Sequence, residues 1–61
     1  MQGTSRLLDA GEVAARLNLP VTWVRDAARR GELPSLKLGH YRRFRSEDVE
    51  SYIAAKAGGA T

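Results

Sequence analysis

The sequence predicts a small, mostly α fold with one β-hairpin, in the order helix, turn, helix, hairpin, helix. Two amphipathic helical segments are separated by only about three residues, which is the length of a tight turn between helices. An alternating segment then turns at a glycine and returns through a run of arginines, and a last helical segment begins at a serine. With 61 residues the chain holds one domain, and this order of elements is that of a winged helix-turn-helix.

The first helix is expected over residues 10–17. Asp9 and Glu12 have the spacing of a capping box, in which each side chain bonds a free backbone N–H at the helix start. Apolar residues then recur at helical spacing on one face, namely Ala10, Val13, Ala14 and Leu17. Residues 1–6 show no such pattern, so we expect a flexible leader before a domain that spans residues 7–56.

The second helix is expected from Pro20 to Arg30, because proline is tolerated in a first helical turn and Gly31 supplies a C-terminal stop. At helical spacing the apolar positions share one side, and they are Val21, Val24, Ala27 and Ala28. The polar positions share the opposite side, and they are Thr22, Arg25, Asp26 and Arg29. Trp23 lies on the flank, where burial in the core and exposure to DNA or to a second protomer both remain open.

The hairpin follows a turn at residues 31–34 that is expected to direct Leu33 into the core. Ser35–Leu38 alternates apolar and polar residues and predicts the first strand. Residues 39–41 are expected at the tip, and Arg42–Arg45 returns as the second strand. The residues expected to face the core from these strands are Leu36, Leu38 and Phe44.

The third helix is expected from an N-cap at Ser46 to about Lys56. Glu47 and Asp48 fall in its first turn, where the helix dipole favours negative charge. Its apolar stripe consists of Val49, Tyr52 and Ile53. The last residues, 57–61, are small and are expected to form a flexible tail.

Positive charge is concentrated in the middle of the chain. Residues 16–45 hold eight of the ten lysines and arginines but only two of the seven acidic residues, and the whole chain has a net charge of +3. Seven of these eight cations are arginines, whose planar guanidinium pairs with phosphate and with guanine in a bidentate manner. This distribution favours a nucleic-acid partner.

Composition argues against several other classes of protein. The chain has no cysteine, which excludes disulfides and thiolate zinc sites, and His40 is its single histidine. We therefore expect no metal site, no cofactor, no catalytic residue and no enzymatic activity. No apolar run approaches the roughly 20 residues that span a bilayer, and the N-terminus does not have the pattern of a signal peptide. We expect no membrane partner and a location in the bacterial cytoplasm, at the nucleoid when the protein is bound.

Two surfaces are candidates for binding DNA. On the second helix, arginine can bond guanine, aspartate can accept from cytosine, and threonine can bond a base or a phosphate. On the hairpin, cations beside an aromatic ring can contact phosphates or enter the minor groove, and strand alternation directs Arg42 and Arg43 to opposite faces. The candidate residues are Thr22, Arg25, Asp26, Arg29, Lys37, His40, Tyr41, Arg42 and Arg43. The alternatives are a solvated helix face and charges that protect an exposed strand edge.

Three motifs together resemble the excisionase-type DNA-binding domains, which are related to the DNA-binding head of MerR-class regulators. The motifs are Leu7-Leu8-Asp9-x-x-Glu12-Val13-Ala14-x-x-Leu17-x-Leu19, then Arg30-Gly31-Glu32-Leu33-Pro34 with Lys37-x-Gly39-x-x-Arg42-Arg43-Phe44, and finally Ser46-Glu47-Asp48-Val49-x-x-Tyr52-Ile53. The resemblance covers residues 7–55. Two positions depart from the family pattern: Pro20 stands where a serine cap is common, and Trp23 stands where a small threonine is common.

The resemblance implies a double-stranded DNA partner and no cofactor. Excisionases of this type bind tandem sites cooperatively, bend the DNA and direct a tyrosine or serine integrase toward excision, and the short chain favours this role. The alternatives are a small stand-alone transcriptional regulator of the MerR-like class and a protein-interaction adaptor that does not bind DNA. Because the sequence has no heptad seam or long apolar helix, we expect a monomer in free solution that self-associates on DNA.

Overall fold

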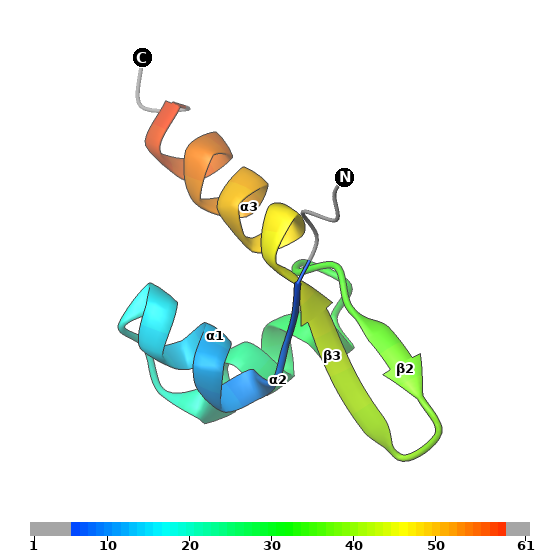
Figure 1. The fold of residues 1–61 in the computed structure, drawn as a ribbon. Helices are drawn as coiled ribbons and strands as arrows, with labels where there is room; N and C mark the ends of the chain where they lie inside the picture. Colours follow the sequence, from blue (N-terminus) through cyan, green and yellow to red (C-terminus); the bar gives the residue numbers. More distant parts are fainter. Residues whose placement is uncertain (1–5, 59–61) are drawn as a thin grey trace.

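The computed structural model describes residues 6–58 and confirms a mostly α, winged helix-turn-helix fold. The elements are β1 (Leu7–Leu8), α1 (Ala10–Leu17), α2 (Val21–Arg29), β2 (Leu36–Leu38), β3 (Tyr41–Arg45) and α3 (Ser46–Gly58). Figure 1 shows α1 and α2 packed together beside the sheet, with the β2–β3 hairpin extending away and α3 leaving the end of β3 in a third direction. The expected helices and hairpin are present, and β1 is an additional strand.

The sheet places β3 in its centre. Its strands are antiparallel and lie in the order β1-β3-β2, so that β1 pairs with the end of β3 and β2 with its beginning. The hairpin turn consists of Gly39 and His40, and Tyr41, which was expected at the tip, is the first residue of β3. Gly39 has a φ of 64°, and a type II′ hairpin turn requires such a positive φ at its first central position, which favours glycine.

The register shows that the placement of Leu36 and Leu38 in the core was wrong. Leu36 lies opposite Arg43, and Leu38 lies opposite Tyr41. Directly opposed residues of an antiparallel pair share one face, and neighbours along a strand alternate between faces. The two leucines therefore lie on the face opposite to Phe44, where Leu38 is 49% exposed, whereas Phe44 is fully buried.

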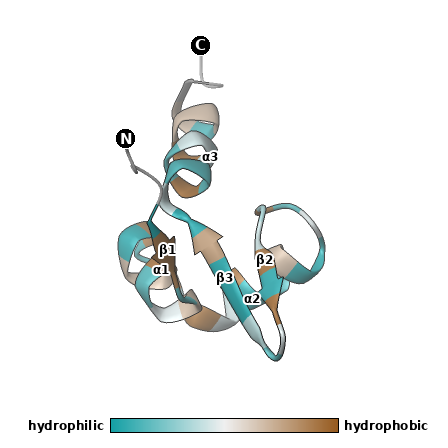
Figure 2. Ribbon diagram, turned by 45° about the vertical axis from the view of Figure 1, so that its right-hand side comes forward, coloured by the Kyte–Doolittle hydropathy of each residue, from teal (hydrophilic) through white to brown (hydrophobic). Residues whose placement is uncertain are grey.

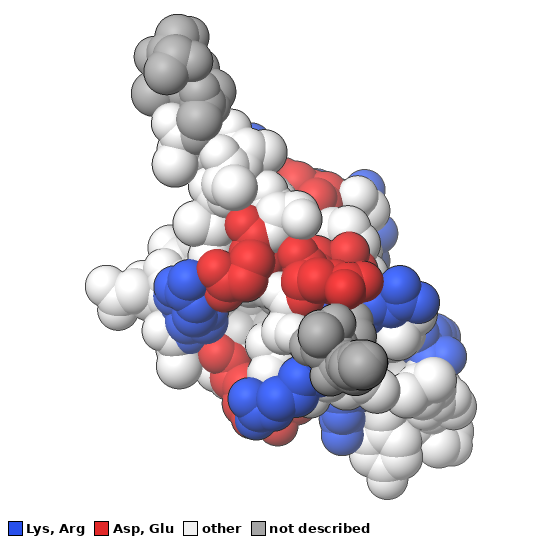
Figure 3. Space-filling model, turned by 45° about the horizontal axis from the view of Figure 1, so that its top comes forward, with Lys and Arg blue, Asp and Glu red and all other residues white. Residues whose placement is uncertain are grey.

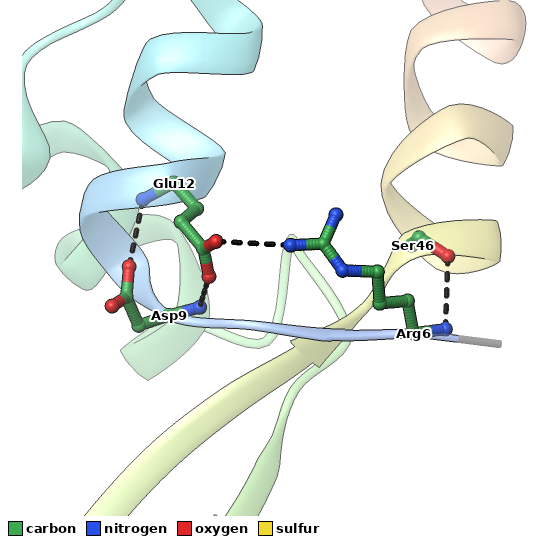
Figure 4. A network of polar contacts seen from close by, with 4 residues as sticks. All are labelled: Arg6, Asp9, Glu12 and Ser46. Carbon is green, nitrogen blue, oxygen red and sulfur yellow. Dashed lines mark hydrogen bonds and ion pairs between the residues drawn. The ribbon is translucent and has the colours of Figure 1, made fainter.

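The two packed helices begin and end close to the expected positions. The Glu12 N–H donates to the Asp9 carboxylate at 2.7 Å, and the Asp9 N–H donates to the Glu12 carboxylate at 2.9 Å, which completes the capping box (Figure 4). Asn18 ends α1 with a φ of 59°, a conformation that asparagine adopts more readily than most residues. Pro20 is the N-cap of α2 and Arg30 is its C-cap. α2 is therefore one residue shorter at each end than the expected helix from Pro20 to Arg30.

The core receives buried side chains from all three helices, from β1 and β3, and from the turn after α2. On α2 the buried residues are Val24, Ala27 and Ala28, as the helical spacing predicted, whereas Val21, expected on the same side, is half-buried and packs against the core. Leu33 is buried in the turn, which confirms its expected inward direction. The largest fully buried side chains are Val13, Val24, Leu33, Phe44 and Val49. Figure 2 shows hydrophobic stretches on β1 and β3, and both strands contact α1.

α3 is anchored mainly through its first half. The Ser46 N–H donates to the Arg6 carbonyl at 2.8 Å, and the Arg6 N–H donates to the Ser46 hydroxyl at 3.1 Å (Figure 4). Val49 is buried and Tyr52 and Ile53 are half-buried, which confirms the expected apolar stripe. Residues 54–57 are exposed. The helix thus leaves the core after about two turns.

The leader and tail expected from the sequence fall largely outside the described residues. Residues 1–5 and 59–61 are not among them. Arg6, expected in the leader, is hydrogen-bonded to the first residue of α3, and Ala57 and Gly58, expected in the tail, belong to α3. Arg6, Ala57 and Gly58 thus take part in the described fold, although they lie outside the expected range of 7–56.

A polar cluster joins α3 to the turn after α2. The Tyr52 hydroxyl donates to the Glu32 carboxylate at 2.9 Å, and the Arg30 guanidinium donates to the same carboxylate at 2.8 Å. The Tyr52 ring meets the Trp23 ring edge to face with centroids 6.3 Å apart, and the Lys56 ammonium lies 5.4 Å from the Tyr52 centroid. Trp23 is half-buried and packs against the core, so part of its ring makes contacts within the domain.

This cluster predicts a contribution of Glu32 to acid stability. The hydrogen bond from Arg30, followed by that from Tyr52, lowers the pKa of Glu32 below its ordinary value of 4.5. Because the folded-state pKa lies below the unfolded-state pKa, the stabilisation is present above the unfolded value and is lost as the pH falls through the folded value. Thermal melts between about pH 5 and about pH 3 should therefore show a shallower loss of Tm for Glu32→Gln than for the wild type.

Tyr52→Phe is the matched variant for this comparison. It keeps the aromatic ring beside Trp23 but removes the second of the two hydrogen bonds to Glu32. Its loss of Tm with falling pH should lie between those of the wild type and Glu32→Gln. Parallel Tm curves for all three proteins would show that Glu32 does not contribute to the pH dependence.

Candidate nucleic-acid interface

α2 and the hairpin face each other across a groove of about 580 Å³. Three segments line it: the start of α1, one stripe of α2, and the tip of the hairpin with the first part of β3. The stripe of α2 consists of Val21, Arg25 and Arg29, which lie four residues apart on successive helical turns. The other lining residues are Asp9, Ala10, Gly11, His40, Tyr41, Arg42 and Arg43.

All four arginines outside the groove are paired with an acidic side chain. Arg16 bonds Glu50 through two nitrogens, at 2.7 and 2.8 Å. The other such pairs are Arg6–Glu12, Arg30–Glu32 and Arg45–Glu47. These pairs are exposed and add little to stability, but they neutralise positive charge locally.

The cations without a carboxylate partner are concentrated at the groove. Among residues 6–58, the lysines and arginines that form no ion pair are Arg25, Lys37, Arg42, Arg43 and Lys56. Three of these five line the groove, and they stand on both of its walls. Their positive charge is thus available to an anionic partner that enters it.

Acidic side chains gather on another face. Figure 3 looks onto the end of the molecule at which α3 leaves the sheet, and it shows acidic side chains side by side in the middle of that face with basic ones around them. The first turns of α3 carry Glu47, Asp48 and Glu50. The surface around the start of α3 is therefore less suited to a polyanion than the groove.

The two neighbouring arginines of β3 are held by different contacts. Arg42 donates to the Ser35 hydroxyl at 2.7 Å. Arg43 lies 5.4 Å from the centroid of the Tyr41 ring and donates to the Arg42 carbonyl at 3.0 Å. The register places them on opposite faces of the hairpin, as strand alternation predicted. These contacts restrict the side chains and reduce the entropy that binding would cost.

The groove brings together six of the nine residues predicted to bind DNA. These six are Arg25, Arg29, His40, Tyr41, Arg42 and Arg43. The other three do not line it: Thr22 is exposed on α2, Lys37 is exposed on β2, and Asp26 bonds the groove residue Arg29 from outside. All nine assignments to DNA binding remain predictions.

Sequence reasoning did not place the start of α1 or Val21 in this surface. Asp9, Ala10 and Gly11 line the groove from α1. Their sequence pattern indicates a helix start and contains no separate signal for binding. They reach the groove because α1 packs against α2, a contact that the short turn between the helices suggests but does not orient.

No helix within residues 6–58 has the length and apolar character needed to cross a membrane. In the same part of the chain, no three His, Cys, Asp or Glu side chains are grouped so that they could hold a metal ion.

Comparison with known proteins identifies a protein family. The model of a protein family described as a helix-turn-helix domain matches residues 7–57. The match contains β1, both packed helices, the hairpin and nearly all of α3. No curated protein and no solved structure matches the chain.

Proposed function

The chain belongs to this family of helix-turn-helix domains, which indicates binding to double-stranded DNA, and we propose that α2 and the β2–β3 hairpin together form the binding surface. In this proposal α2 lies in the major groove, as recognition helices of helix-turn-helix domains do. The hairpin lies over the neighbouring phosphates or reaches into the minor groove. The DNA backbone between these two contacts passes through the groove of the protein.

This proposal rests on the positions of the arginines that form no ion pair within residues 6–58. Arg25 stands on the α2 wall, and Arg42 and Arg43 stand on the hairpin wall. A guanidinium donates in a bidentate manner to phosphate oxygens or to guanine. Since Arg42 and Arg43 lie on opposite faces of the hairpin, Arg25 from α2 and one of these two arginines from the hairpin can contact one phosphate backbone from two sides. A protein-interaction adaptor with the same fold would not need this arrangement.

The salt dependence of DNA binding tests this function. If three or four phosphates are neutralised, the affinity for duplex DNA should fall about 40- to 150-fold between 50 and 200 mM salt. Fluorescence anisotropy with a labelled random-sequence duplex measures this directly. Affinity that does not change with salt, or absence of binding at 50 mM salt, would exclude the proposal.

We further propose an architectural role of the excisionase type, supported by the resemblance of the three sequence motifs. A module of this size covers roughly 600–1,000 Å² of protein surface on DNA, which is little for selecting one site in a genome. Copies bound at adjacent sites increase the discrimination, because each bound protomer raises the effective concentration of the next. We therefore expect a monomer in free solution that binds tandem sites cooperatively and bends the duplex.

An in vitro recombination assay tests this role. With a tyrosine or serine integrase and its attachment sites, the protein should shift the reaction toward excision. Gel-shift titration on one-site and multi-site DNA should show cooperative filling of adjacent sites, and sedimentation should show a free monomer. A stable free dimer, or regulation of a promoter without an effect on any tested integrase, would favour a transcriptional regulator instead.

A further inference from the structure

Asp26 is the one acidic residue of α2, and it bonds Arg29. Arg29 lines the groove, whereas Asp26 does not. The two side chains are 73% and 50% exposed, respectively, so the pair is open to solvent and to an approaching ligand. Among the arginines that line the groove, Arg29 is the one whose charge is balanced by a carboxylate of the described residues.

The fold does not explain a carboxylate at this position. Asp26 does not cap α2, because Pro20 is the N-cap and no side chain bonds the first N–H groups. It lies in the second half of α2, where the helix dipole disfavours negative charge. An exposed pair three residues apart adds little to stability. On a surface that binds DNA, a carboxylate also repels the phosphate backbone.

We propose that Asp26 is a specificity-determining residue of α2, an inference that rests on the DNA binding proposed above. In the free protein Asp26 holds Arg29, so Arg29 adds little to the affinity for DNA of any sequence. Arg29 contributes fully only where the DNA satisfies both members of the pair. Asp26 thus lowers the affinity for most sequences and raises the discrimination in favour of a few.

A G·C base pair in the major groove has the required chemistry. Guanine presents two adjacent acceptors, O6 and N7, which suit the guanidinium of Arg29. Cytosine presents an amino donor, N4, which suits the carboxylate of Asp26. An A·T pair presents an amino donor but no two adjacent acceptors on one base, so Arg29 would lose its bidentate contact there.

Asp26→Asn and a matched control separate this effect from that of net charge. Asparagine removes the negative charge but keeps the shape of the side chain. Glu47→Gln removes the same charge from α3, where Glu47 lies 3.8 Å from Arg45 and neither residue lines the groove. Asp26→Ala is a second variant, in which alanine favours the helix. Thermal melts establish that each variant is folded.

The probes are a random-sequence duplex pool and the pool enriched from it by the wild-type protein. Asp26→Asn and Asp26→Ala should bind the starting pool several-fold more tightly than the wild type. The slope of log affinity against log salt concentration should be steeper by the amount that about one further phosphate contact adds. The ratio of affinities for the enriched and starting pools should fall by about fivefold or more, the lower end of what one base contact contributes. Enrichment with Asp26→Asn should weaken the preference for a G·C pair at one position, and Glu47→Gln should leave the ratio unchanged.

The outcomes distinguish this inference from the proposed function. If the wild type and all variants bind DNA with the same ratio, DNA binding stands and the role of Asp26 is overturned. If Glu47→Gln lowers the ratio as much as Asp26→Asn, net charge explains the effect and the role of Asp26 is also overturned. If the wild type binds neither pool at low salt, the proposed function fails and this inference fails with it.

Discussion

Replacing Phe44 by alanine is expected to lower the free energy of unfolding by about 3–5 kcal/mol, because it removes a large apolar side chain and leaves a cavity. Phe44 is fully buried on the central strand of the sheet. The free energy of unfolding of native proteins is roughly 0.05–0.15 kcal/mol per residue. The loss expected for Phe44→Ala is therefore most of the free energy of unfolding of this chain. Urea titration followed by circular dichroism should show a largely unfolded protein in dilute buffer.

Tyr41→Ala is the control on the same strand. Tyr41 is 63% exposed, so its truncation removes little buried surface and should cost less than about 1 kcal/mol. Phe44→Leu, which keeps most of the apolar volume, should cost clearly less than Phe44→Ala. If Phe44→Ala and Tyr41→Ala had the same midpoint, the assignment of Phe44 as the centre of the core would be incorrect.

Arg25→Ala is expected to weaken DNA binding while leaving the fold intact. Arg25 is exposed on α2, lines the groove and has no carboxylate partner among residues 6–58. Loss of a base contact would cost about 1–3 kcal/mol, which corresponds to a rise in Kd of about 5- to 150-fold at one DNA sequence. Loss of a phosphate contact would weaken binding to all sequences about equally and lower the salt slope by about one.

Arg16→Ala removes an equal charge elsewhere. Arg16 is paired with Glu50 at 2.7 Å and does not line the groove. Anisotropy titrations with the same duplexes should give a Kd much closer to that of the wild type than the Kd of Arg25→Ala. Equal losses for the two variants would mean that overall charge, and not the surface on α2, determines binding.

The helices could be predicted well because their signals are local. Asp9 and Glu12 identify the first residue of α1, and the apolar spacing identifies the buried side of α2. The end residues of α2 differed by one position because Pro20 and Arg30 cap the helix instead of belonging to it. Such differences arise from the geometry of the final turn, which sequence patterns indicate only approximately.

The sheet was predicted less completely because its pairing is non-local. β1 has only two residues, which is too short to show an alternating pattern, and it exists because β3 offers a free edge. Alternation along β2 gave the correct period for Leu36 and Leu38 but did not indicate which face is buried. That choice depends on the register set by the turn at Gly39.

The candidate site was predicted in part for a similar reason. Counting charges along the chain located the basic region but not the pairing of its members. Arg16 and Arg45 belong to that region, yet Glu50 and Glu47 of α3 neutralise them. Only the folded arrangement distinguishes these arginines from Arg25, whose charge remains available.

The hydrogen bonds between Arg6 and Ser46 join two residues that are 40 positions apart in the chain. During synthesis, β1, α1 and α2 leave the ribosome before β3 and α3 do, and until β3 has emerged the edge of β1 has no strand to pair with. The core can close only when Phe44 and Val49 have also emerged, because both fill its centre. The domain therefore folds as one unit after nearly all of it has been translated. A nascent chain released before α3 would display the apolar sides of both packed helices to chaperones and proteases.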